Sequence, residues 1–434
     1  MNDYKYEVFY PGVYSSEEQD ALDRMFEPRQ GGPGGPGGPG GPGAGGPPMM
    51  KQQVFQTDPT NEILMRMYAE RIVPDNPLYN DPSYAAKTWY GALPAVPGYI
   101  QGMAMGPQLP KELGSMGMPQ RQLAGDAYDN EIEYYLPVVA GDKIHNGKES
   151  FEIKDVTDPN GSTFRVFVVI SSVEMVNQRG EVVGKSINRM PSMLRRCKEG
   201  YTPDANIHPF SVYVHPAHKY TEEDYEKLKD VWSREKIRGA ETLYWDDVQV
   251  GESIWETAEG PFTQLESIRM HGQELVGCRS IREELMSGHM RTKMNNDGLY
   301  LNYITHYNPE RNSFYNYTSR DYIVRTITNW MGDRGFLTRI NWRMVNDYVP
   351  ELAANPFPEG FYRESYLLKV PELREKGAFI NTHGWAPDCS FNKGYIYDKY
   401  EKDGKFYVDI ACWCQDMDGN YLSEVGVTVC LPKK

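Results

Sequence analysis

Cysteine is scarce in this chain: 6 cysteines among 434 residues are too few for a disulfide scaffold. Cys412-Trp413-Cys414 lacks the Cys-x-x-Cys spacing of a zinc half-site, so we expect no metal. No apolar run approaches the ~18 residues of a membrane span, and residues 1–6 have neither the basic start nor the apolar core of a secretory signal. These absences predict a cytoplasmic protein with reduced thiols and no membrane partner.

Positive charge is also in short supply. Lys and Arg number 46 against 60 Asp and Glu, which gives a formal net charge of −14. An acidic surface repels phosphates, so we expect no nucleic-acid partner. A phosphorylated ligand needs only a local basic cluster, and Arg195-Arg196-Cys197-Lys198 is one, although a solvated loop is the more common explanation of such a run.

The sequence signatures of several enzyme classes are missing. There is no phosphate loop, no Rossmann glycine pattern, no Gly-x-Ser-x-Gly elbow and no His-Glu-x-x-His zinc helix. We therefore predict a protein that needs no cofactor of its own.

What is present is a globular composition behind an unusual N-terminal part. Hydrophobic residues make up 40% and charged residues 24%, as in proteins with a packed core, and 434 residues suffice for two domains. Residues 31–48 repeat Gly-Gly-Pro. We interpret them as a flexible tether, because the triplets are few and glycine takes the middle position that proline often holds in collagen.

Periodic patterns begin after this tether. Asp58-Pro59-Thr60 starts a predicted helix that Pro74 ends, with Ile63, Met67 and Ile72 on its apolar face. Strand patterns follow at 132–136, 151–156, 164–176 and 181–190, the last two joined by a turn at 177–180.

The end of the chain repeats this arrangement. Strands at 406–414 and 421–431 flank a turn, with Phe406 in the place of Phe167 and Gly419 in that of Gly180 (406 − 167 = 239; 419 − 180 = 239). A helix pattern at 261–268 precedes them, as one at 59–68 precedes the first hairpin. Hairpins are common in antiparallel proteins, but the repeated order indicates a duplicated domain.

A polar connector with one predicted helix, at 221–232, separates the two copies. We divide the chain into an N-terminal extension (1–30), a Gly/Pro-rich segment (31–50), a first half (51–200), the connector (201–240) and a second half (241–434).

The stretch 73–81 reads Val-Pro-Asp-Asn-Pro-Leu-Tyr-Asn-Asp. It resembles the Gly-Asp-x-Asn-Pro-(Leu/Ile/Val)-His run of R-specific enoyl-CoA hydratases in the MaoC-like group. Three further segments, 174–181, 244–252 and 328–337, are similar to parts of two-half members of that group. On these segments, which span most of the chain from residue 54 to 431, the protein resembles the two-half MaoC-like dehydratases.

This resemblance implies an α+β fold of two fused hot-dog domains, each an antiparallel sheet wrapped around a central helix. It implies that the acyl-pantetheine arm of a CoA thioester lies between the halves, where a backbone N–H at a helix start polarises the carbonyl. An aspartate and a histidine then move protons through one water. Coenzyme A enters as part of the substrate, and the chain is expected to pair with another copy or with a related subunit.

The first half departs from the family's pattern. Pro74 stands at the aspartate position and Tyr79 at the histidine position, so this half is not expected to supply the base. Asp75, Asn76, Tyr79 and Trp89 are candidates for binding substrate instead. Hydrogen bonds that fasten a loop explain Asp75 and Asn76 as well, together with Asp81, and core packing or a mobile loop explains Trp89.

The second half offers His306-Tyr307-Asn308-Pro309-Glu310, about where a related branch has a His-aromatic-Asp run. His306 is the candidate general base or acid, with Asn308 or Glu310 positioning water; a loop histidine held by hydrogen bonds is an equal alternative. Asp333 follows a helix predicted from Ser319 through Trp330. We expect it to cap the break at 332–335, or else to face the substrate.

We therefore predict a hydro-lyase that adds or removes water across the Cα–Cβ bond of an acyl-CoA thioester. The alternatives are a non-catalytic subunit that binds an acyl-CoA or a partner protein, and a thioesterase on the same fold.

Overall fold

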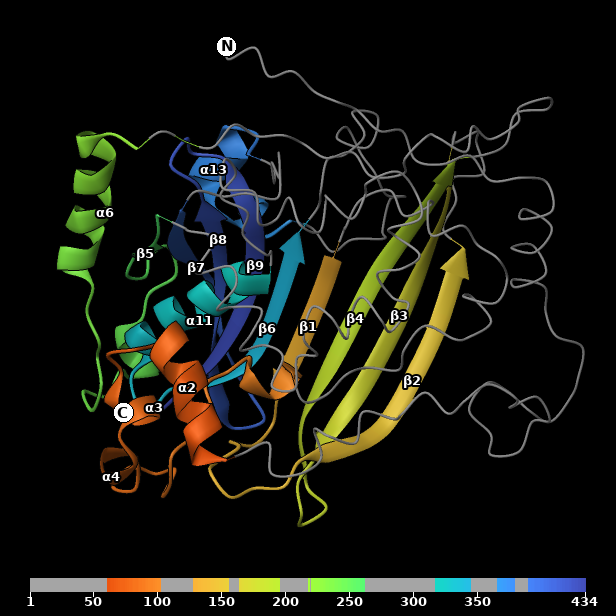
Figure 1. Cartoon of the computed structure of the whole chain (residues 1–434), viewed down its shortest axis with the longest axis vertical. Coiled ribbons are helices and arrows are strands. Elements are labelled where there is room, and N and C mark those ends of the chain that lie inside the picture. The colour runs from red at the N-terminus through yellow and green to blue at the C-terminus, as the bar shows by residue number, and fades with distance from the viewer. Residues whose placement is uncertain are drawn as a thin grey trace, which may run out of the picture.

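The computed structural model describes residues 61–102, 128–155, 164–195, 218, 220–261, 317–344, 365–378 and 389–434. Within these ranges the chain forms one nine-stranded sheet with a long helix against it and several shorter helices (Figure 1). No helix of the described ranges is long and apolar enough to cross a membrane.

All neighbouring strands of the sheet are antiparallel, and their order is β2-β3-β4-β1-β6-β9-β8-β7-β5. The predicted strands overlap with observed ones. The strands are β1 (Tyr128–Tyr134), β2 (His145–Asp155), β3 (Phe164–Val176), β4 (Val182–Arg195), β5 (Thr257–Glu259), β6 (Phe336–Met344), β7 (Ser390–Lys402), β8 (Lys405–Gln415) and β9 (Tyr421–Leu431).

The two halves of the sheet repeat one strand order. Outward from the junction, the first half runs β1, β4, β3, β2 and the second half runs β6, β9, β8, β7, with β5 beyond β7. In each half the first of these strands along the chain lies at the junction, followed outward by the fourth, the third and the second. β1 pairs with β6, which joins the halves into one continuous sheet. The predicted fold class is therefore confirmed: two fused hot-dog units of the α+β class. Residues 262–268 of the helix predicted for the second copy lie outside the described residues.

Helix α11 (Tyr317–Met331) packs against one face of the second-half strands (Figure 1). As predicted, Ile323, Ile327 and Trp330 are buried. Val408, Ile410 and Cys412 of β8 belong to the same core. Because side chains alternate along a strand, every second residue of β8 points at the helix.

The opposite row of β8, with Ala411 and Trp413, packs under η5 (Tyr366–Lys369) and α13 (Pro371–Glu375). Tyr366 lies directly over Gly426 of β9, and a Cβ at that position would overlap its ring. Glycine at 426 thus lets η5 cover the second face of the sheet.

Charged side chains line the junction of the halves, on the face away from α11. Asp129 and Glu131 of β1 are almost fully buried. Glu131 accepts a hydrogen bond from Arg339 of β6 at 2.6 Å, and Asp129 lies 3.5 Å from Arg343 of the same strand. Arg189 of β4 lies 3.1 Å from each of the two carboxylates. Ion pairs therefore cross the junction in addition to the backbone hydrogen bonds.

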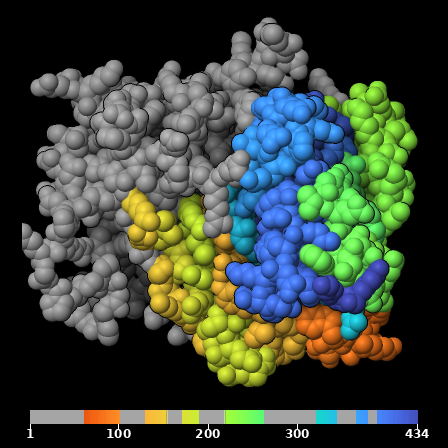
Figure 2. All heavy atoms as spheres, turned by 180° about the vertical axis from the view of Figure 1, so that it is seen from behind, coloured from red at the N-terminus to blue at the C-terminus, as the bar shows by residue number. Residues whose placement is uncertain are grey.

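Helix α6 (Glu222–Arg234) confirms the helix predicted in the connector. Thr221 caps it: its hydroxyl accepts from the Asp224 N–H at 3.3 Å, and the Asp224 carboxylate accepts from the Thr221 N–H at 2.9 Å. Leu228 and Val231 pack with residues of the β5 edge. Figure 2, which views the molecule from behind, shows α6 in green along the edge of the blue C-terminal strands.

Candidate functional site

The stretch that resembles the family motif lies in a run of three short helices: α2 (Glu62–Ile72), α3 (Pro77–Asn80) and α4 (Pro82–Ala85). Asn76 caps α3, since its Oδ1 accepts from the Leu78 N–H at 3.1 Å. Asp81 caps α4 and accepts from the Ser83 N–H at 2.8 Å. Asn76 and Asp81 thus fasten the loop, as one of the two interpretations held, whereas Asp75 makes no hydrogen bond to the described residues.

The apolar face predicted for α2 is wrong in part. Ile63 and Met67 are 69% and 46% exposed, whereas Met65 and Tyr68 are buried; of the predicted face, Ile72 alone is buried. The buried side of α2 is the one that meets the core around α11.

The motif loop is held against the central helix of the other half. Asn76 Nδ2 donates to Asn329 Oδ1 of α11 at 3.4 Å. Asn80 Nδ2 donates to the carbonyl oxygens of Val73 and Asn76, at 2.7 and 3.0 Å. Both halves therefore contribute to the spaces around this loop.

A polar cavity of about 360 Å³ lies where the loop, the end of α6 and α11 meet. Arg325 on its wall donates to Glu235 at 2.5 Å and also to Glu259. Its volume falls within the range of small-molecule sites, roughly 300–1,000 Å³. The lining residues are Val73, Asp75, Asn76, Trp232, Glu235, Ile237, Arg325 and Asn329.

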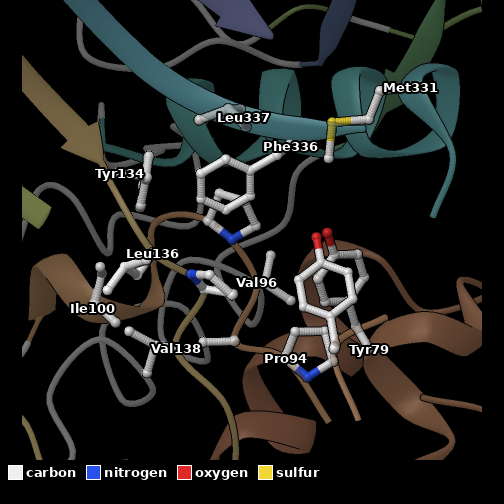
Figure 3. A pocket seen from close by; sticks show the side chains of 14 residues that line it. Tyr79, Pro94, Val96, Ile100, Tyr134, Leu136, Val138, Met331, Phe336 and Leu337 are labelled. Carbon is white, nitrogen blue, oxygen red and sulfur yellow. The ribbon is translucent and has the colours of Figure 1, made fainter. Parts of the chain in front are cut away.

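Tyr79 faces a second, apolar pocket. In Figure 3, Met331, Phe336 and Leu337 of the second half lie on one side of it, and first-half residues such as Pro94 and Val138 lie on the other. The pocket volume is about 30 Å³, room for about one water molecule. As it stands, this pocket admits a group the size of a methylene and no long chain.

Burial keeps Tyr79 protonated. The residue is 2% exposed, and the loss of hydration, together with the charges of Tyr90 and Asp333, raises the pKa of its phenol well above the ordinary value. A phenol that holds its proton cannot act as a general base near neutrality. The residue at the family's histidine position is therefore part of the pocket wall in this half.

Asp333 connects the two halves just beyond α11, which ends at Met331 and is followed by Gly332 with φ +69°. Asp333 Oδ2 accepts from the Tyr84 hydroxyl at 2.6 Å, and its backbone carbonyl accepts from Trp89 Nε1 at 2.8 Å. The side chain thus binds Tyr84 and does not cap the 332–335 turn as expected. Trp89 is 47% exposed and packs on Tyr90.

The second carboxylate oxygen of Asp333, Oδ1, is buried and has no hydrogen-bond partner in the described part of the chain. Burial raises the pKa of this carboxyl above its ordinary value, and the Tyr84 hydrogen bond opposes that rise. The folded state therefore holds this proton more tightly than the unfolded chain does. The resulting contribution to stability is present at low pH and is lost as the pH rises through the folded pKa.

We predict that Asp333→Asn raises the free energy of unfolding near pH 7, by about 1 kcal/mol, because the amide keeps an acceptor for Tyr84 and removes a buried charge. Urea unfolding at pH 5 and pH 8 measures this, with the exposed Asp403→Asn as control. The gap between variant and wild type should be wider at the higher pH. A variant that is less stable than wild type at both pH values would contradict the prediction.

A buried ionic cluster at the start of α11 was not predicted. Arg320 Nη2 donates to Asp321 Oδ1 at 2.7 Å, and Arg71 lies 3.5 Å from Asp321. Gly98 approaches closely: its N–H donates to the Tyr134 hydroxyl at 2.8 Å, and a Cβ there would lie 3.2 Å from the Asp321 carboxylate. An Arg-Asp pair in a helix usually indicates an exposed face, so the sequence carried no signal for this cluster.

The predicted catalytic residues His306, Asn308 and Glu310 lie outside the described residues, and their roles stay predictions. Within the described ranges no group of His, Cys, Asp and Glu side chains is placed to hold a metal ion.

Residues 57–186 match a family model described as FAS1-like, dehydratase domain region. No protein of curated function matches the sequence. Similar solved structures include a putative MaoC domain protein dehydratase from Chloroflexus aurantiacus, at 12% identity and TM-score 0.43, covering 86% of this chain and 92% of that one. A MaoC-like dehydratase from Phytophthora capsici matches at 11% identity and TM-score 0.39, covering 86% and 93%.

A third structure is a conserved hypothetical protein of Mycobacterium tuberculosis described as having a double hot-dog fold. It is 8% identical, with TM-score 0.42, and the match covers 86% of this chain and 92% of that one. The family match falls on the region that holds the motif loop, β1, β2, β3 and the start of β4. Residues 57–186 are thus similar to a FAS1-like dehydratase region, and the resemblance of the chain to the MaoC-like double hot-dog dehydratases is confirmed.

Proposed function

We propose that the protein is a hydro-lyase that adds water to, or removes it from, the Cα–Cβ bond of an acyl-CoA thioester. The observation that carries this proposal is the dehydratase-region match over residues 57–186, in a chain whose sheet is a fused pair of hot-dog units. Coenzyme A is part of the substrate, and no separate cofactor takes part.

The second half supplies the proton transfer in this proposal. His306 moves the proton, and Asn308 or Glu310 holds the water that is added or released. The first half binds, because Pro74 has no acidic side chain and Tyr79 keeps its proton. The acyl group would point at the apolar pocket beside Tyr79, while Asp75 and Asn76 face the polar cavity and Trp89 and Asp333 fasten the two halves together.

The size of the apolar pocket favours a short acyl group. Phe336 projects into this space in Figure 3, so Phe336→Ala should enlarge it. We expect the ratio of kcat/KM for a long-chain to a short-chain enoyl-CoA to rise by roughly 10-fold, since each buried methylene is worth about 0.8 kcal/mol.

The matched control is Phe406→Ala. Phe406 is also partly buried, but it packs against Trp245 and does not line the pocket. Equal changes of the chain-length ratio in both variants would show that lost stability, and not pocket volume, causes the effect.

The alternative of a non-catalytic binding subunit is favoured by one feature, the loss of both catalytic residue types from the first-half motif at Pro74 and Tyr79. A panel of enoyl-CoA thioesters of increasing chain length, assayed with the full chain, separates the two functions. The hydro-lyase proposal predicts turnover of at least the short members. Binding without turnover of any member would support the alternative.

A further inference from the structure

The polar cavity beside α11 is lined by more carboxylates than its one basic side chain can neutralise. Arg325 is the one basic side chain on its lining, and two carboxylates, Glu235 and Glu259, already pair with it. Asp75 adds a third carboxylate, and no basic group of the described residues lies within ion-pair distance of it. Among the residues that line the cavity, the two carboxylates of Asp75 and Glu235 and the one guanidinium of Arg325 leave a net charge of −1 (−2 + 1 = −1), while Glu259 pairs with Arg325 from outside the lining.

A buried amide on the same wall has a donor to spare. Asn329 is 4% exposed and lines the cavity. Its Oδ1 accepts from Asn76, but its Nδ2 donates to no group of the described chain. An amide N–H₂ that lines a cavity and has no protein acceptor is suited to a ligand that brings a carbonyl or hydroxyl oxygen.

An aromatic ring completes the lining. Trp232 of α6 donates its indole N–H to the Ala258 carbonyl at 2.9 Å, which fixes the orientation of the ring. The side chain is still 42% exposed. An indole face attracts a cation through its quadrupole, and the carboxylates of the cavity attract the same cation through their charge. Asp75 is exposed as well, so a ligand can reach this end of the cavity from solvent.

We propose that this cavity binds a small organic cation, a primary ammonium group held by Asp75, Glu235 and Trp232 on a molecule whose carbonyl oxygen accepts from Asn329. The volume of about 360 Å³ accommodates such a molecule, and the net negative charge disfavours phosphates and carboxylates. The inference does not depend on the hydro-lyase proposal, because it rests on the lining of a space separate from the apolar pocket.

Isothermal titration of the full chain with three matched amides tests the proposal. The probes are 6-aminohexanamide, hexanamide and the monoamide of adipic acid, which share one amide and differ at the far end of the chain. We expect 6-aminohexanamide to bind at least ~10-fold more tightly than hexanamide, since a charge-assisted hydrogen bond is lost in the latter. The anionic monoamide should bind more weakly than either. Equal affinities for the three probes, or no measurable binding of 6-aminohexanamide, would overturn the proposal.

Substitutions at Asp75 locate the site. Asp75 makes no hydrogen bond within the described chain, so Asp75→Asn should fold normally and lower the affinity for 6-aminohexanamide by roughly 10-fold. Asp75→Lys, which places an ammonium in the cavity, should abolish binding. The control is Glu401→Gln, an exposed position that loses the same charge away from the cavity. Unchanged affinity in both Asp75 variants, or equal losses in Asp75→Asn and Glu401→Gln, would refute the assignment.

Discussion

Replacing His306 with alanine is expected to lower kcat for enoyl-CoA hydration by roughly 10²- to 10⁴-fold, the contribution that a positioned general acid or base makes to such a step. KM should change much less, because in the proposed function other residues bind the acyl group and the coenzyme A arm. The pH–rate profile should also lose the limb that reports an imidazole, whose ordinary pKa is about 6.5. Steady-state assays of wild type and variant between pH 5 and pH 9 measure all three effects.

His289→Ala is the matched control, since this histidine lies in the same part of the sequence but is not part of a His-aromatic-Asp-like run. Its kcat should stay close to that of the wild type. If His306→Ala retains full activity, or if both variants lose activity equally, His306 is not the proton-transfer group.

Replacing Asp129 with alanine is expected to destabilise the fold by about 3–5 kcal/mol, as removal of one partner from a buried ion pair generally does. Asn341 Nδ2 donates to Asp129 at 2.6 Å, and Arg189 and Arg343 lie 3.1 and 3.5 Å from its carboxylate. All three would lose an acceptor at the junction of β1 and β6. Urea unfolding followed by circular dichroism gives the free energy of unfolding and its slope.

Asp230→Ala serves as the control for this prediction. Asp230 pairs with Arg234 at 2.7 Å, but both side chains are more than half exposed, so water replaces the lost contact. The control should leave the midpoint of unfolding unchanged. A small shift for Asp129→Ala, similar to that of the control, would show that the junction does not depend on its buried charges.

The strands and the duplication followed directly from sequence patterns. β3 and β9 have the bounds that apolar patterns and turn residues predicted, because a strand buried on one face carries apolar residues with a period of two and a strand buried on both faces carries a continuous apolar run. The apolar stripe of α11 was equally readable, since a helix that packs in a core has no other way to bury Ile323 and Ile327.

Elements whose burial depends on distant neighbours were less predictable. α2 carries apolar residues on more than one side, and the position of the core alone decides that Met65 is buried and Ile63 exposed. The contacts of Asp333 with Tyr84 and Trp89 join residues more than two hundred positions apart. The pairing of Arg320 and Asp321 inside the core has no sequence signal, because the same dipeptide is common on exposed helices.

The motif loop, residues 73–81, resembles the family's catalytic run, but its residues have structural roles in this chain. Its Asn-Pro-Leu core indicated the family, and the match over residues 57–186 agrees. Within it, Asn76 caps α3 and contacts Asn329, while Tyr79 is a buried and protonated wall residue. The loop lines the spaces between the halves, and in the proposed function the second half carries out the chemistry.

Incubation of a short-chain enoyl-CoA with the full chain in water labelled with heavy oxygen, followed by mass spectrometry, tests the central claim most directly. The hydro-lyase account predicts an intact CoA thioester that has gained one labelled water, with the label on the β-carbon hydroxyl. Label in a free carboxylic acid together with released coenzyme A, or an unchanged thioester despite measurable binding, would contradict it.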